Sequence, residues 1–492
     1  MLALKPIDLQ NEKNAAIVIP VCEDKNIHTE KTIINLVKTT ETIKPFKGRE
    51  DDELILYHLQ DVGAPCVIFL GIGKAADADA EIWRIVASKA VKTGIKKELS
   101  SVSVVVPSAK KTGMEKERLI VSMAEGALLG NHRFDLYKKK KKLKPLKEIN
   151  LLTASNVTAE LEKLTARTAL VCDGAILARE WVSIPPNDKR PARFAKLIIK
   201  QAKKENLNIT VMKEKELKRK KCGAILAVAA GSQSKPRMLI LSHEPKNAEK
   251  TVALIGKGVT FDSGGINLKP TGSLDTMKMD MAGAAAVAAT MITLARIKSD
   301  VKTIGVIPIV ENMPSGHASR PGDIIKTYSG KSVEIGNTDA EGRLILADAM
   351  AYTIDQFKPD LMIDLATLTG ACVAALGEKI AGVFSSDKKL SKAIITSGER
   401  TFERCWPLPL PEDYQKFLKS EFADIKNLSS SRWGGAITAA LFLSEFVGDT
   451  AWAHIDIAGP AYIEKADTYC GAGGTGFGVR LLCDLLPNLF DV

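Results

Sequence analysis

Apolar and polar residues alternate along the first 150 residues in short blocks. Three apolar, β-prone runs lie at Ala15–Val21, Cys66–Leu70 and Val102–Val106. A helical pattern at Ala78–Lys97 lies between the second run and the third. Because strands that alternate with helices form mostly parallel sheets, this part of the chain predicts a smaller N-terminal α/β domain at residues 1–150.

The same alternation returns from about residue 185 onward, now with glycine-rich turns. Strong strand patterns lie at Val252–Ile255, Thr303–Ile309 and Leu361–Leu365, and helical patterns lie at Gly283–Ala295 and Ala340–Tyr352. These elements predict a larger C-terminal α/β domain over residues 183–492, with a central mixed, mostly parallel sheet. In such sheets the chemistry gathers beyond the carboxyl ends of the strands.

A lysine-rich segment marks the expected boundary between the two domains. Residues Tyr137–Glu148 (YKKKKKLKPLKE) carry seven lysines in twelve positions. A block of like charge usually forms a solvated loop, although a nucleic-acid or membrane patch is the functional alternative. The helical pattern of Thr158–Val182 follows, so we expect a linker helix within residues 151–182.

Composition places the chain among globular proteins. Of its 492 residues, 45% are hydrophobic and 26% are charged, which argues against a disordered or fibrous chain. Lysine and arginine outnumber the acids 69 to 58, and the resulting net charge of +11 favours anionic partners without identifying one.

The cysteines and apolar stretches indicate a soluble, cytoplasmic protein. None of the eight cysteines has CxxC spacing, so we expect buried thiols in a reducing cytosol rather than a zinc ribbon or a disulfide framework. The first residues lack the apolar core of a signal peptide. Met281–Ala295 is alanine-rich and too short to span a bilayer, so it predicts a buried helix.

Several common catalytic motifs are missing from the sequence. It contains no HExxH zincin motif, no GxSxG nucleophile elbow and no GxxxxGK[ST] phosphate loop. The glycine-rich segment Gly71–Ala76 follows a predicted strand and raises the alternative of a nucleotide-binding module. A GxGxxA segment by itself is weak evidence, and a plain tight turn is the favoured interpretation.

Two aspartates stand among apolar residues and glycines at strand ends. Asp262 follows a strand and precedes Ser263-Gly264-Gly265, and Asp280 interrupts a run of methionine and alanine. Each could be an ordinary turn or cap residue. A carboxylate in apolar surroundings is nevertheless costly unless it is paired or bound to a metal.

A second acidic group lies at a strand-to-helix junction. Asp339, Glu341 and Arg343 follow one another within GNTDAEGRLILADAM. The structural alternative is a capping box, in which Thr338 and Glu341 satisfy the start of a helix. Together with Asp262 and Asp280, however, these acids could form the oxygen cage that two divalent cations need.

These motifs resemble those of the leucyl aminopeptidase family (peptidase family M17, the cytosol aminopeptidases, including bacterial aminopeptidase A). The resemblance covers residues of about 160–492. It rests on six segments: GKGVTFDSGG (Gly256–Gly265), ENMPSGHASRPGD (Glu311–Asp323), NTDAEGRL (Asn337–Leu344), LATLTGA (Leu365–Ala371), AHIDIAGPA (Ala453–Ala461) and GGTGFGVR (Gly473–Arg480).

The resemblance implies a di-metal exopeptidase that releases N-terminal amino acids, preferably leucine and other apolar residues. By similarity, Lys257, Asp262, Asp280 and Glu341 hold one ion, and Asp262, Asp339 and Glu341 hold an exchangeable one; the ions are zinc or manganese, with magnesium as an alternative. Lys269 would stabilise the oxyanion. Arg343 would hold a bicarbonate ion that acts as the general base.

The resemblance also implies a side-chain pocket and an assembly. The expected pocket residues are Met277, Thr367, Leu368, Gly370, Ala458 and Ala461. Alanine at 461, where some members carry methionine, would widen the pocket. The family forms homohexamers that cleave short peptides with a free N-terminus, and no membrane partner is expected. Some bacterial members also bind DNA as architectural or regulatory proteins, so DNA is an alternative partner here.

Overall fold

The computed structural model describes residues 2–43, 45–139, 143–246 and 248–489. The chain forms two compact units, one of Met1–Cys172 with Lys465–Ala472 and one of Asp173–Glu464 with Gly473–Val492. Both are α/β, as the sequence predicts. Their division falls inside the long helix α5 (Ala159–Ser183).

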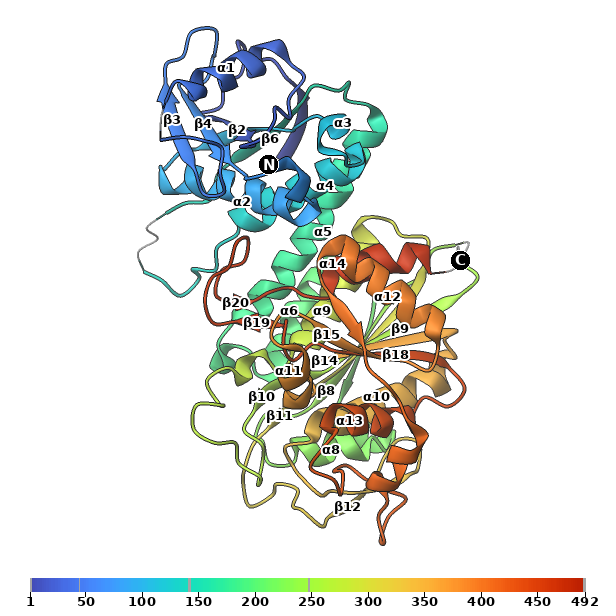
Figure 1. Cartoon of the computed structure of the whole chain (residues 1–492). Coiled ribbons are helices and arrows are strands. Elements are labelled where there is room, and N and C mark those ends of the chain that lie inside the picture. Colours follow the sequence, from blue (N-terminus) through green and yellow to red (C-terminus); the bar gives the residue numbers. More distant parts are fainter. Residues whose placement is uncertain (1, 44, 140–142, 247, 490–492) are drawn as a thin grey trace. The chain divides into compact units, whose positions relative to one another are not determined.

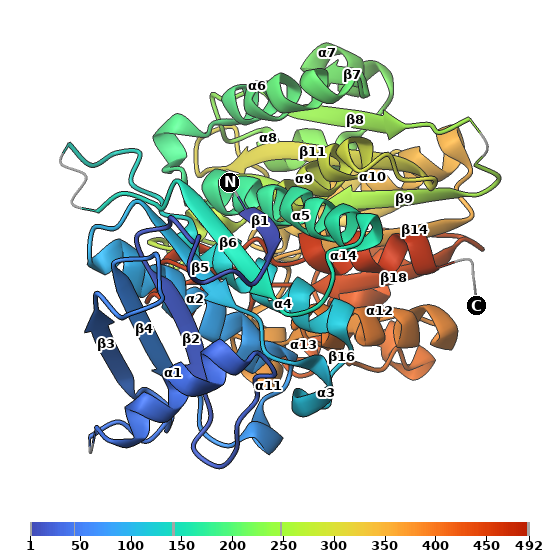
Figure 2. The ribbon, with the colours of Figure 1, turned by 90° about the horizontal axis from the view of Figure 1, so that it is seen from above.

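The first unit is built on a six-stranded sheet whose strands lie side by side in Figure 2. All neighbouring strands are parallel except the edge pair β3–β4. In spatial order they are β1 (Leu2–Pro6), β6 (Glu148–Thr153), β5 (Ser101–Val105), β2 (Ile17–Val21), β4 (Cys66–Gly71) and β3 (Glu53–Tyr57). The three strands predicted in this part are confirmed to within two residues.

Helices cover both faces of this sheet because its strands are apolar on both sides. Val18 and Ile68 pack with the core under α2 (Ala80–Lys96) and α4 (Lys116–Asn131). The alternate residues Ile17 and Phe69 pack in the core of the other face, which includes Ile33 of α1 (Lys31–Glu41).

The glycine-rich segment after β4 forms a turn. Gly73 has φ +77° and its N–H donates to Gly48 O at 3.0 Å. Helix α2 begins only at Ala80, and the Asp79 carboxylate accepts from the first N–H groups of that helix. Because the Asp79 carboxylate already accepts these N–H groups, they are not available to bind a nucleotide phosphate. The segment is therefore better interpreted as a plain tight turn.

The second unit is built on a larger mixed, mostly parallel sheet, as predicted (Figure 1). In spatial order its strands are β16 (Cys405–Pro407), β15 (Ala381–Phe384), β18 (Ala451–Asp456), β14 (Leu361–Ala366), β9 (Thr251–Gly256), β11 (Lys302–Asn312), β8 (Arg237–His243) and β7 (Asn208–Lys213), and β10 (Gly258–Asp262) pairs with the end of β11. The parallel centre β18–β14–β9–β11 includes the three strands predicted from apolar runs.

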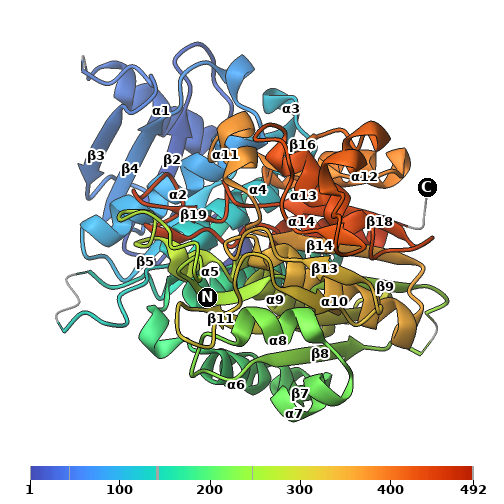
Figure 3. The same ribbon diagram turned by 90° about the horizontal axis from the view of Figure 1, so that it is seen from below.

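Two layers of helices enclose this sheet. One face carries α6 (Pro191–Ala202), α9 (Ala282–Arg296), α12 (Lys388–Thr401) and α14 (Val479–Leu485). The other face carries α8 (Gly223–Ala229), α10 (Glu341–Phe357) and α13 (Gly435–Ser444). These three helices are labelled in the view of Figure 3.

The predicted buried helix is α9. With the short turn before it, the stretch 277–296 is long and apolar enough to cross a membrane, but 83% of its apolar window is buried inside the protein. It is therefore a core helix of the second unit. All eight cysteines are also buried, as expected.

The remaining elements are short. They are α3 (Ala109–Thr112), α7 (Glu214–Arg219), α11 (Gly370–Leu376), β12 (Ile324–Lys326), β13 (Ser332–Glu334), β17 (Ile425–Lys426), β19 (Tyr462–Ile463), β20 (Gly473–Gly474) and the 3-10 turns η1 (Ala75–Asp77), η2 (Pro186–Asp188), η3 (Lys203–Glu205), η4 (Met277–Met279), η5 (Glu412–Leu418) and η6 (Leu486–Asn488).

Candidate active site

Four segments of the second unit bring charged residues together at the carboxyl ends of central strands. Lys257 follows β9, and Asp262 is the last residue of β10. Asp280 follows η4, and Glu341 is the first residue of α10. Ligand sites of open α/β sheets form at this end of the strands, where successive loops converge.

The three acids Asp262, Asp280 and Glu341 form the centre of the site. Each is buried and offers a carboxylate oxygen within 4.8 Å of the others. Lys257 lies against two of them: its Nζ is 2.7 Å from Asp280 Oδ1 and 2.9 Å from Glu341 Oε1. The same Nζ donates to Thr367 O at 2.8 Å.

A second lysine joins the remaining acid to this centre. Lys269 Nζ lies 2.9 Å from Asp262 Oδ2 and 2.6 Å from Asp339 Oδ1. The Lys269 side chain is partly exposed, as is that of Asp339, so this is the solvent-accessible side of the cluster.

Two glycines give the charged groups room. Gly264 has φ +86°, and a Cβ there would stand 2.3 Å from Asn267 O and 2.8 Å from Asp339 Oδ1. Gly342 faces Lys257: a Cβ at 342 would stand 2.6 Å from its Cε. Real Cβ atoms do not approach so closely, so only glycine permits this loop and this lysine position.

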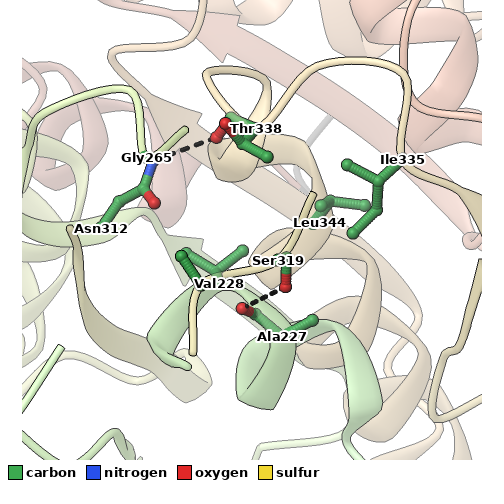
Figure 4. A pocket seen from close by; sticks show the side chains of 9 residues that line it. Ala227, Val228, Gly265, Asn312, Ser319, Ile335, Thr338 and Leu344 are labelled. Atoms are coloured by element: carbon green, nitrogen blue, oxygen red, sulfur yellow. Dashed lines mark hydrogen bonds between the residues drawn. The ribbon is translucent and has the colours of Figure 1, made fainter. Parts of the chain in front are cut away.

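Asn312, at the end of β11, holds two loops of the site together and was given no role from the sequence. Its Nδ2 donates to Asp262 Oδ1 at 2.8 Å and to Thr338 O at 3.0 Å. Figure 4 shows Asn312 and Thr338 at the wall of a cavity of about 10 Å³, room for a single water molecule. Its position within the segment Glu311–Asp323 is the signal that could have identified it.

The capping-box alternative for the start of α10 is wrong. The helix is preceded by Ala340, which makes no side-chain cap bond. The Thr338 hydroxyl instead donates to Gly264 O at 2.6 Å. It is therefore used to join the two acidic loops and is not available to satisfy the start of the helix.

The electrostatics of the cluster reflect burial of many charges in one place. Burial alone would lower the pKa of Lys257, but the charges of Asp280, Glu341 and Asp262 together raise it above its usual range. Burial, with Asp262 close by, raises the pKa of Glu341 to about 8, and burial raises that of Asp280 to about 6.

Two oxygens of the cluster have unused acceptor capacity. Asp280 Oδ2 and Glu341 Oε2 are buried without a hydrogen-bond partner among the described residues. Buried acceptors of this kind are costly, and a cation would satisfy them. The donor set, four carboxylates with two lysines, therefore fits hard divalent ions.

Arg343 lies on the first turn of α10, with 9% of its surface exposed. Its Nη1 donates to Asn427 O at 2.8 Å, while its Nε is buried without a partner in the described part of the chain. Burial lowers the pKa of its guanidinium to about 10, against the opposing charges of Glu341 and Asp456. A cation with a free donor is suited to an anion.

The predicted pocket residues occupy three segments near the cluster. Thr367 and Leu368 follow β14, and Gly370 is the first residue of α11. The Thr367 hydroxyl donates to Asp280 Oδ1 at 2.8 Å. Ala458 and Ala461 follow β18, and Met277 begins η4, three residues before Asp280. Ala461 is almost fully buried, whereas Gly370 is exposed.

Comparison with known proteins gives the same family for both units. The model described as "Cytosol aminopeptidase family, catalytic domain" matches residues 176–483, and "Cytosol aminopeptidase family, N-terminal domain" matches residues 22–141. A probable cytosol aminopeptidase of Syntrophotalea carbinolica is 43% identical over 450 residues, 90% of each chain. One of Desulfotalea psychrophila is 38% identical over 490 residues, 96% of each chain.

Solved structures agree with these relatives. The bottromycin maturation enzyme BotP matches with a TM-score of 0.86 at 32% identity, over 97% of this chain and all of that one. BotP in complex with Mn matches with the same TM-score and identity. These relatives give no support to the DNA-binding alternative, and Lys140–Lys142 of its lysine run lie outside the described residues.

Proposed function

The chain belongs to the cytosol aminopeptidase family, and from that premise we propose that it is a metal-dependent aminopeptidase that prefers N-terminal leucine and other apolar residues. The observation that carries the proposal is the convergence of three buried carboxylates around Lys257. Two of them have an oxygen without a partner in the part of the chain that the structure describes. Most buried polar atoms in proteins are hydrogen-bonded, so two unpartnered oxygens in one buried cluster indicate a place for a ligand.

We assign the metal ligands by similarity to the family and by their fit to the cluster. Lys257, Asp262, Asp280 and Glu341 would hold one ion, and Asp262, Asp339 and Glu341 the second. Two divalent cations, zinc or manganese, would polarise the scissile carbonyl and acidify a water. The more exposed Asp339 suits the exchangeable position.

The protein's own groups complete the chemistry. Lys269 presents a partly exposed ammonium beside Asp262 and Asp339, where it would stabilise the oxyanion that forms on the peptide carbonyl. Arg343 would hold a bicarbonate ion through its free Nε, and that ion would take the proton from water.

The substrate is a short peptide with a free N-terminus. Met277, Thr367, Leu368, Gly370, Ala458 and Ala461 would bind its first side chain, and the small Ala461 leaves room for a branched apolar one. A cytoplasmic homohexamer, as the family resemblance implies, remains a prediction that mass measurement in solution tests.

The test is hydrolysis of leucyl-p-nitroanilide by the full chain. We expect a chelator to abolish turnover and manganese or zinc to restore it. Asp339→Asn and Glu341→Gln should lose most activity, whereas Asp173→Asn, an exposed partner of Arg296, should not. Wild-type turnover in either site variant would contradict the metal assignment.

A further inference from the structure

Asp456 is a fully buried carboxylate that the proposed chemistry does not use. It is the last residue of β18, paired in register with Ala366 at the end of β14. Its carboxylate oxygens accept hydrogen bonds from neighbouring loops.

Those hydrogen bonds come from both sides of the candidate pocket. Asp456 Oδ1 accepts from Leu368 N at 3.1 Å and from Ala458 N at 3.1 Å. Asp456 Oδ2 accepts from the Thr369 hydroxyl at 2.7 Å. One side chain thus joins the loop after β14 to the loop after β18, and both loops carry predicted pocket residues.

The Thr369 bond extends this junction into α11. The Thr369 hydroxyl donates to Asp456 and accepts from Cys372 N at 3.0 Å, which caps the helix. The start of α11, where Gly370 lies, is therefore fixed relative to β18 through a hydroxyl that serves both partners. The two backbone N–H groups can only donate, so they require an acceptor at the position of Asp456 Oδ1.

We propose that Asp456 is the positioning residue that sets the width of the side-chain pocket, and hence the preference for branched apolar residues at the substrate N-terminus. This inference rests on the proposed aminopeptidase function. An alanine here would remove both carboxylate oxygens, so Leu368 N, Ala458 N and the Thr369 hydroxyl would lose their shared acceptor and the two loops would no longer be joined.

The test compares leucyl- and alanyl-p-nitroanilide as substrates of the holoenzyme. In Asp456→Ala we expect the ratio of kcat/KM for leucyl over alanyl substrate to fall roughly tenfold, the scale of discrimination by apolar pockets. The metal content should equal that of the wild type. A loss that is merely structural would lower both substrates equally and leave the ratio unchanged.

Asp348→Ala is the matched control. Asp348 is also fully buried and accepts backbone N–H groups, from Ile225 at 2.9 Å and from Tyr328 at 2.7 Å, and neither belongs to the predicted pocket. Its replacement should lower stability and leave the substrate ratio unchanged.

A second pair of variants covers the case in which Asp456→Ala does not fold. Thr369→Val removes the hydroxyl and should lower the ratio, whereas Thr369→Ser retains it and should keep the wild-type ratio. A wild-type ratio in Thr369→Val, or in a folded Asp456→Ala, overturns this inference and leaves the proposed function untouched. If the metal-loaded wild type cleaves neither substrate, the proposed function fails and this inference with it.

Discussion

Replacing Lys257 with methionine tests how much the charged cluster contributes to stability when no metal is bound, separately from its proposed role in catalysis. In the metal-free protein the Lys257 ammonium is the counter-charge for Asp280 and Glu341, at 2.7 and 2.9 Å. All three side chains are at most 6% exposed. Methionine has a similar volume, so Lys257→Met removes the charge while largely keeping the packing.

The expected cost follows from burial. Removing one partner of a buried ion pair costs about 3–5 kcal/mol, because it leaves an uncompensated charge in the interior. At about 2–4 °C per kcal/mol, this corresponds to a Tm lowered by about 6–20 °C. An exposed pair would shift the Tm by no more than about 2–4 °C, since such pairs contribute at most about 1 kcal/mol.

The assay measures thermal unfolding by calorimetry, in excess chelator at pH 8. Lys5→Met is the matched control, because Lys5 pairs with Glu148 at 3.3 Å with both side chains about half exposed. If Lys257→Met unfolds at the wild-type temperature in chelator, the buried-charge reasoning is refuted. If Lys5→Met is equally destabilised, burial is not the cause.

Three further predictions concern buried polar groups around the site. Asn312→Leu removes the donor to Asp262, and we expect metal affinity, measured by titration, to fall about 10–100-fold, with unchanged affinity as the contrary result. Asp348→Asn should cost about 1–3 kcal/mol in denaturant unfolding, because its partners are both backbone donors, and a loss below the measurement error would contradict this. Burial lowers the pKa of His454, but the Asp364 charge outweighs burial and raises that pKa above its usual value. The pair of His454 with Asp364 therefore stabilises the fold fully below pH 6.5, and this contribution is lost as the pH rises through the folded-state pKa. The stability gap between wild type and His454→Gln should therefore narrow from pH 6 to pH 9, and a gap that widens would reverse the assignment.

Local patterning predicted much of the fold. The runs at Cys66–Leu70 and Leu361–Leu365 are strands because each is apolar on both faces and short, as in a sheet covered by helices. The pattern predicts a helix over Ala340–Tyr352, whereas the observed helix begins one residue later and continues to Phe357. Its start was misread because Thr338 has a tertiary partner, Gly264, that no local pattern reveals.

The family motifs indicate the acids of the site, but not the residues whose hydrogen bonds join the surrounding loops. Asn312 and Asp456 lie within quoted segments. Yet Asn312 donates to residues 26 and 50 positions away, and Asp456 accepts from residues 87 and 88 positions away as well as from nearby Ala458. Hydrogen bonds over such separations depend on strand order, and the order β18–β14–β9–β11 differs from the order along the chain.

The sequence by itself determined the alternation of strands and helices, the two α/β units and the acidic residues with their two lysines. These follow from local periodicity, turn-forming glycines and motif spacing, all of which act over a few neighbouring positions. Only the tertiary structure decided which oxygens of Asp280 and Glu341 lack a partner, and that Asp456 joins two pocket loops. Those properties depend on loops from separate strands meeting at one edge of the sheet, where burial makes each unpaired charge or acceptor costly.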